Sequence, residues 1–154
     1  MTKCVHQVSA VLLLTAAMLL LRPGSLLSRA PEKTKAPTAV EIAKEWRYPG
    51  AAVDKSVTSS KSENFYIESY SVEADFADVW NHFAAKSGSE EKFKDNKVWL
   101  VMGELKGPDK GHYLVFGDGR EADFGQNTES RTVHVEIRKA GGGRVNVLLV
   151  AGVR

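Results

Sequence analysis

The amino-acid sequence predicts an α+β fold, in which a five-stranded, mostly antiparallel sheet (β-α-β-β-β-β) packs on one main helix. Two observations lead to this prediction. Residues 76–88 carry a strong amphipathic helical pattern. Residues 97–152 instead carry apolar runs and alternating apolar and polar residues, separated by turn signals, which are typical of strands. A helix that is followed by several strands has a sheet to cover, so we expect it to lie on one sheet face.

Length and charge indicate one domain behind a basic leader. The chain has 154 residues, of which 43% are hydrophobic and 26% are charged, as is ordinary for a globular protein. The formal net charge is +2, but three of the 21 basic residues and none of the 19 acidic residues lie within residues 1–30. The rest of the chain therefore has 18 basic and 19 acidic residues, a net charge of −1. This balance argues against a nucleic-acid partner, which would need a clustered basic face.

Residues 1–30 have the pattern of a signal peptide. Lys3 precedes an apolar run of 14 residues, Val8–Leu21, and Ser28 and Ala30 place small residues where a signal peptidase cleaves. The run is shorter than the roughly 20 residues that a membrane-spanning helix needs. Four basic residues after the run oppose the usual charge balance, so an uncleaved N-terminal signal or anchor helix stays open as an alternative. The sequence thus predicts a periplasmic or secreted protein, with membrane contact only through this segment if it is retained.

Residues 31–62 are predicted to be a linker that contains one short helix, 38–46. The linker begins with proline, lysine and alanine residues that show no periodicity. Thr38 and Glu41 then have the spacing of a capping box, and a Tyr-Pro-Gly turn signal follows the helix. A helix of two turns is marginal by itself, so we expect Trp46 to anchor it on another surface.

Residues 63–154 are predicted to form the α+β domain. A strand over residues 65–72 leads into the main helix, which Asp75 caps at its N-terminus and Gly88 ends in a left-handed conformation. The apolar side chains of this helix recur at three- and four-residue spacing and form one stripe: Phe76, Val79, Trp80, Phe83 and Ala84. We expect this stripe to bury against the sheet.

Four further strands are predicted after the main helix. They cover residues 97–105, 112–117, 131–139 and 144–152. The last of them has a continuous apolar run, so we expect it to be central in the sheet. Residues 118–130 are predicted to be a long polar loop. If the short helix covers a second sheet face, Trp99 is expected to pack on Trp46.

The search for chemistry gives candidates for ligand binding, but none for catalysis, a metal or a cofactor. Long loops are often functional, so Asp118, Arg120 and Asp123 are the first candidates for a polar ligand site, together with His112. The predicted loop does not fit a calcium-binding loop, because Arg120 and Asp123 stand where an oxygen ligand and a glycine are required. The only cysteine, Cys4, lies in the leader, and no histidine pair has metal-ligand spacing.

A short motif gives one resemblance. The segment Trp46-Arg47-Tyr48-Pro49-Gly50-Ala51 follows the leader and precedes a strand and a helix opened by Asp75, with Val79 and Phe83 on that helix. This arrangement resembles small exported bacterial proteins of unknown function that carry a YPGA-type element. The likeness covers about a third of the chain. It implies an exported α+β protein and no known activity.

These observations predict an exported, non-catalytic binding or interaction domain. Two alternatives stay open. One is a small extracytoplasmic hydrolase that uses His112 and residues 118–129, and the other is a membrane-anchored accessory subunit with a protein partner in the cell envelope. The missing catalytic constellation favours the binding domain, and the sequence indicates no particular ligand.

Overall fold

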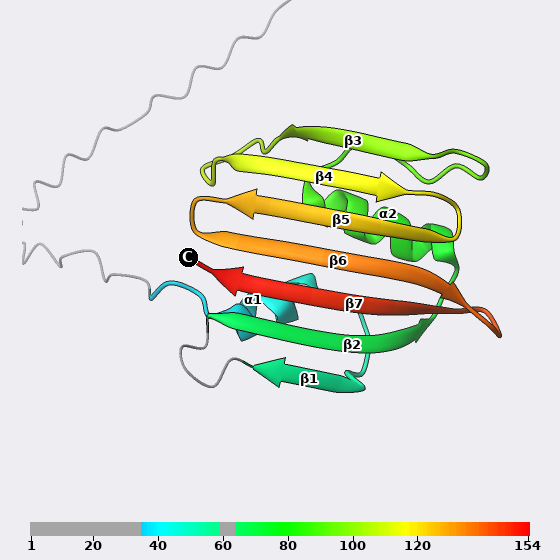
Figure 1. The fold of residues 1–154 in the computed structure, drawn as a ribbon, viewed down its shortest axis with the longest axis horizontal. Helices are drawn as coiled ribbons and strands as arrows, with labels where there is room; N and C mark the ends of the chain where they lie inside the picture. The colour runs from blue at the N-terminus through cyan, green and yellow to red at the C-terminus, as the bar shows by residue number, and fades with distance from the viewer. Residues whose placement is uncertain (1–34, 59–63) are drawn as a thin grey trace, which may run out of the picture. The chain divides into compact units, whose positions relative to one another are not determined.

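The computed structural model describes residues 35–58 and 64–154; the predicted signal peptide or anchor lies outside these residues. The described chain forms two helices and seven strands (Figure 1). Their bounds are α1 Ala39–Trp46, β1 Lys55–Thr58, β2 Phe65–Glu73, α2 Phe76–Ser87, β3 Trp99–Glu104, β4 Gly111–Gly117, β5 Glu121–Thr128, β6 Arg131–Ala140 and β7 Arg144–Val153.

The strands form one sheet in the order β1-β2-β7-β6-β5-β4-β3, and every neighbouring pair is antiparallel. Strands β3 to β7 follow one another as consecutive hairpins, and β7 returns to pair with β2 (Figure 1). The predicted fold class is therefore wrong. The described residues are mostly β, with seven strands and two helices, and not five strands packed on one main helix; the predicted signal or anchor helix lies outside them.

Both missed strands are polar. The predicted long loop 118–130 contains β5, whose inward positions hold Ala122, Phe124, Gln126 and Thr128. Two of these four side chains are polar, so the apolar alternation that marks a strand is hidden. Pairing with β4 and β6 on either side makes the segment a strand despite its composition. β1 also lies in a segment that is predicted to be loop. It has only four residues, too few for a clear pattern, and its pairing with β2 makes it a strand.

Both helices cover the same face of the sheet and leave the other face free (Figure 1). α1 packs on β2 and β7, and α2 packs mainly on β4, β5 and β6. The predicted contact between Trp46 and Trp99 is therefore wrong, because α1 covers the opposite half of the sheet from β3. Trp99 instead packs on Trp80 of α2, with ring centroids 4.8 Å apart.

The main helix agrees with its prediction in extent and in its buried stripe. α2 ends at Gly88, whose φ of 104° requires the left-handed conformation that glycine adopts without strain. Asp75 occupies the N-cap position, but its side chain accepts no capping hydrogen bond. β7 lies inside the sheet as predicted, although only one of its faces is covered, and Leu148 remains 37% exposed.

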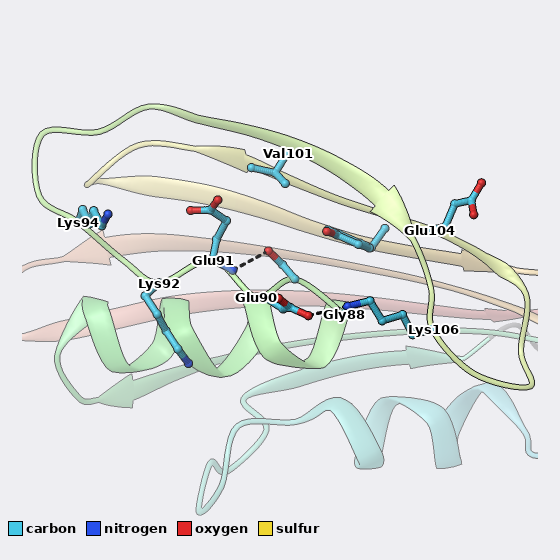
Figure 2. Close-up of a pocket in the computed structure, with 10 residues that line it drawn as sticks. Gly88, Glu90, Glu91, Lys92, Lys94, Val101, Glu104 and Lys106 are labelled. Atoms are coloured by element: carbon cyan, nitrogen blue, oxygen red, sulfur yellow. Dashed lines mark hydrogen bonds and ion pairs between the residues drawn. The ribbon is translucent and has the colours of Figure 1, made fainter.

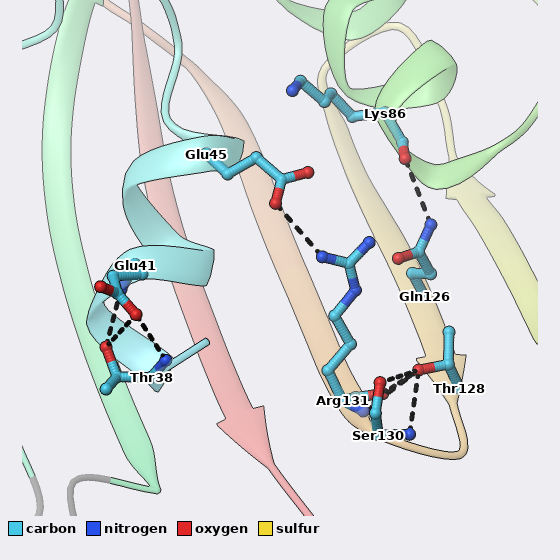
Figure 3. Close-up of polar contacts among 8 residues, drawn as sticks. All are labelled: Thr38, Glu41, Glu45, Lys86, Gln126, Thr128, Ser130 and Arg131. Atoms are coloured by element: carbon cyan, nitrogen blue, oxygen red, sulfur yellow. Dashed lines mark hydrogen bonds and ion pairs between the residues drawn. The ribbon is translucent and has the colours of Figure 1, made fainter. Parts of the chain in front are cut away.

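Polar contacts attach the helices to the sheet around the β5–β6 turn (Figure 3). α1 begins with the predicted capping box, in which the hydroxyl of Thr38 accepts a hydrogen bond from the amide of Glu41 at 3.3 Å. Arg131 on β6 forms an ion pair with Glu45 of α1 at 3.2 Å. The side chain of Gln126 donates to a carbonyl in the last turn of α2 at 3.4 Å. The two helices are thus bound to neighbouring strands by side chains of the sheet.

The Arg-Tyr-Pro-Gly segment after α1 has a structural role in the described protein. Arg47 forms a bidentate ion pair with Glu68 of β2, whose side chain is completely buried; the bond from Arg47 Nε is 2.9 Å long. The amide of Tyr48 donates to the hydroxyl of Tyr70 at 3.1 Å. The Tyr48 ring also lies edge-on to His82 of α2, with centroids 5.1 Å apart. This segment therefore links α1, β2 and α2.

His82 makes the stability of this junction depend on pH. Burial lowers the pKa of His82 below its ordinary value of 6.5, and a hydrogen bond to the backbone of Trp46 offsets this only in part. Below about pH 6.5 the unfolded chain binds a proton that the folded protein resists, so the free energy of unfolding falls as the pH falls. We expect urea unfolding to show a lower free energy of unfolding at pH 5.5 than at pH 7.5. In a His82→Phe variant this difference between the two pH values should be smaller.

The matched control is His112→Gln, which removes an exposed histidine on β4 and should keep the pH dependence of the wild-type protein. If His82→Phe and the wild-type protein lose stability equally over this pH range, His82 is not the source of the pH dependence.

Candidate functional site

The face of the sheet that the helices leave free divides into two halves. Over β3 and β4 it is apolar, with Leu100, Met102 and Phe116 exposed by 71%, 74% and 49%. Over β5 and β6 it is polar and charged, with Asp123 and His134 facing outward. The two-residue period of the strands places these side chains on the free face, because alternate side chains point to opposite faces of a sheet.

A hollow of about 520 Å³ lies at the boundary between the two halves. Its centre is Gly125, which stands between Leu114 on β4 and His134 on β6 in the sheet register. Glycine has no side chain, so the surface is lowered at this point, while Met102 and Leu114 form an apolar wall on one side. A methyl group placed at Gly125 would lie 3.6 Å from Leu114 Cβ, an ordinary contact, so the backbone does not require glycine here.

Polar residues line one end of the hollow in a row across four strands. The sheet register places them side by side in the order Glu104, His112, Asn127 and Thr132, which we call the polar row. The side chain of Asn127 accepts a hydrogen bond from the hydroxyl of Thr132 at 3.1 Å. The hollow thus offers an apolar wall and an end that can donate and accept hydrogen bonds, as ligand sites commonly do.

An Asp–His pair includes one residue that lines the hollow, His134. Nε2 of His134 lies 3.0 Å from Oδ1 of Asp123, and both side chains are partly exposed. Among residues 35–58 and 64–154, His134 makes no other side-chain hydrogen bond, so no hydroxyl nucleophile is attached to this pair. In the same ranges no three His, Cys, Asp or Glu side chains are grouped as metal ligands.

The four residues predicted as a ligand site do not form one site. Asp118 and Arg120 lie at the β4–β5 turn, where Oδ1 of Asp118 accepts hydrogen bonds from the amides of Arg120 and Glu121 at 2.7 and 3.1 Å. These bonds lower the pKa of the Asp118 carboxyl, and they fix the turn. His112 stands at the other end of β4 and lines the hollow, and Asp123 contributes the Asp–His pair.

No family model matches this chain, and no curated protein does. None of the helices in the described part of the chain is long and apolar enough to cross a membrane. The resemblance carried by the YPGA-type element therefore stays a prediction, and the function rests on the geometry of the described residues.

A second cleft, of about 490 Å³, lies between the loop after α2 and strands β3 and β4 (Figure 2). One ion pair lies within this cleft, and a second joins one of its carboxylates to a lysine outside it. Lys106 contacts Glu90 at 2.7 Å, and both side chains are more than four-fifths exposed. Lys97, which lies outside the cleft, contacts Glu91 at 3.1 Å. These exposed pairs are screened by water, so the hollow around Gly125 is the better candidate for ligand binding.

Sequence reasoning missed most of the hollow because its residues come from four strands. Met102, Leu114 and His134 are unremarkable separately, and they meet only through the register of three hairpins. One local signal was present: Gly125 interrupts a strand, which often marks a close approach or a lowered surface. That signal could be used only after β5 was known to be a strand.

Proposed function

We propose that this protein is an exported, non-catalytic binding domain that holds a small ligand in the hollow around Gly125. The observation that carries the proposal is the hollow itself, which has an apolar wall and a polar row at one end. Its volume of about 520 Å³ is within the range of small-molecule sites. Export is supported by the signal-peptide pattern of residues 1–30.

The lining of the hollow favours a ligand with an aromatic or branched apolar body and one hydrogen-bonding end. Met102 can adapt to different apolar shapes because its side chain is unbranched and polarizable. The polar row presents an acidic group, an imidazole, an amide and a hydroxyl, so it can pair with a neutral donor or acceptor group.

Filling the hollow tests this proposal. In Gly125→Val the new side chain occupies the hollow, and valine suits an exposed strand position. We expect the full-length protein to bind N-phenyl-1-naphthylamine, a neutral aromatic amine, and the variant to bind it at least ~10-fold more weakly, a loss of about 1.4 kcal/mol. Fluorescence titration of the probe measures the affinity.

Gly141→Val is the matched control. Gly141 lies in the turn between β6 and β7, outside the hollow, and a methyl group there would have no contact within 4 Å. This variant should bind the probe like the wild-type protein, and thermal melting should show that both variants fold. The apolar leader is present in all three proteins, so probe bound to it cancels in the comparison. Equal affinities of the wild-type protein and Gly125→Val would refute the proposal.

The other two functions remain alternatives with separate tests. The hydrolase was predicted to use His112 and residues 118–129; in the structure the histidine that contacts Asp123 of this segment is His134, so activity on an ester panel that His134→Gln abolishes would favour a hydrolase over simple binding. An anchored accessory subunit would depend on the leader, so detergent dependence of the full-length protein and co-purification of one partner would favour that function.

A further inference from the structure

The two ends of the sheet differ in how they are protected. β1, at one end, is a strand of four residues that begins with Lys55. β3, at the other end, is six residues long and reads Trp-Leu-Val-Met-Gly-Glu, with no proline or lysine to oppose another strand. Natural edge strands are usually short, charged or interrupted, because their unpaired backbone groups attract other strands. β3 lacks this protection.

The backbone groups on the free side of β3 belong to its exposed residues. The amide of Leu105 donates to the carbonyl of Gly111 at 2.9 Å, so the residues at odd positions of β3 direct their backbone groups toward β4. Leu100, Met102 and Glu104 therefore direct theirs outward, to the open edge. The same edge thus carries free donors, free acceptors and two apolar side chains that are more than 70% exposed.

The side chains of this edge form a continuous apolar patch. Val98 is 72% exposed just before β3, and Leu100 and Met102 are exposed to a similar degree on the same face. Phe116 on β4 lies beside Leu100 in the register and is 49% exposed. Nothing within residues 35–58 and 64–154 lies against the outer side of this patch, and another strand placed there would cover both the backbone groups and the side chains.

We propose that β3 pairs antiparallel with β3 of a second copy of this chain, so that two sheets join into one. A two-fold axis perpendicular to the sheet leaves the free faces of both copies on the same side. Residues that point to the free face in one copy therefore pair with residues that point to the free face in the other. With the axis at Val101, Leu100 of one copy lies opposite Met102 of the other. The strand is thus complementary to itself.

Charge fixes the direction of this pairing. Glu104 is the one charged residue of β3, and parallel alignment would place the two Glu104 side chains side by side. Antiparallel alignment with the axis at Val101 places Glu104 opposite Val98 of the other copy. Because the contact is one six-residue strand from each copy, it is small for a protein interface, and we expect dissociation in the micromolar range. The proposal does not depend on the ligand-binding function.

Hydrogen exchange tests the pairing directly in the full-length protein, kept soluble with a mild non-ionic detergent. The amides of Leu100 and Met102 point outward, so they should exchange at least about 10-fold more slowly at high than at low protein concentration. Exchange of these amides that does not change with concentration would overturn the proposal, even if the leader causes association by another route.

Two matched substitutions locate the contact. Leu100→Lys places a charge in the centre of the paired edge and should weaken dimerisation at least ~10-fold in analytical ultracentrifugation. Leu148→Lys makes the same change on the same sheet face but within β7, away from the edge, and should leave dimerisation unchanged. Loss of dimers in both variants would indicate face-to-face association and contradict edge pairing, as would a dimer that Leu100→Lys does not weaken.

Discussion

Replacing Trp80 with alanine is expected to lower the free energy of unfolding by about 3–5 kcal/mol. Trp80 is completely buried at the centre of an aromatic cluster. Its ring lies 4.8 Å from Trp99 of β3, 5.6 Å from Phe124 of β5 and 6.0 Å from Phe93 of the loop after α2, as centroid distances. Alanine would leave a cavity where three elements meet α2. Urea unfolding followed by tryptophan fluorescence or circular dichroism measures the loss.

The loss should come from packing and not from a hydrogen bond. The indole nitrogen of Trp80 has no hydrogen-bond partner in the described protein, so Trp80→Phe should cost clearly less than Trp80→Ala. Asp78→Ala is the surface control on the same helix and should change the stability by no more than about 0.5 kcal/mol. A Trp80→Ala protein that keeps the wild-type melting temperature would show that this cluster does not hold α2 on the sheet.

Replacing Arg47 with alanine is expected to cost roughly 3 kcal/mol of unfolding free energy. The carboxylate of Glu68 is fully buried, and Arg47 is its ion-pair partner, with a side chain that is 25% exposed. Alanine would leave a buried charge without a partner, which costs more than the loss of an exposed ion pair. The partial exposure of Arg47 places the cost near the lower end for buried pairs. Chemical denaturation at pH 7 measures it.

A double variant separates the buried charge from the local packing. Arg47→Met combined with Glu68→Leu replaces the ion pair by two apolar side chains, and it should recover most of the lost stability. Lys106→Ala removes one partner of an exposed pair and should produce no measurable change. An Arg47→Ala protein that unfolds at the wild-type urea midpoint would mean that water already reaches Glu68.

The sequence predicted the elements whose apolar residues are regularly spaced. α2 was predicted almost to the residue because its stripe and its terminal Gly88 agree, and β6 because Val133, Val135 and Ile137 alternate with polar residues. β5 was missed because its inward positions include Gln126 and Thr128. Neighbouring strands impose its conformation, and such tertiary effects leave no local pattern.

The pairing of β2 with β7 and the position of α1 were also beyond local sequence patterns. Hairpins can be expected from turns, but the return of β7 to β2 joins segments that are far apart in the chain. The candidate site was hidden for the same reason. His112 was named for its chemistry alone, and its neighbours Asn127 and Glu104 became visible only with the strand register.

The alternation of the strands also separates positions that tolerate substitution from positions that do not. On β4, β5 and β6 the residues that form the core, such as Val115, Phe124 and Val135, alternate with residues that form the free face. Substitutions at exposed positions usually change stability by no more than about 0.5 kcal/mol. Residues of the free face can therefore be substituted one at a time while the face that the helices cover stays unchanged. A substitution on the free face thus changes what this surface presents and leaves the packing beneath the helices intact.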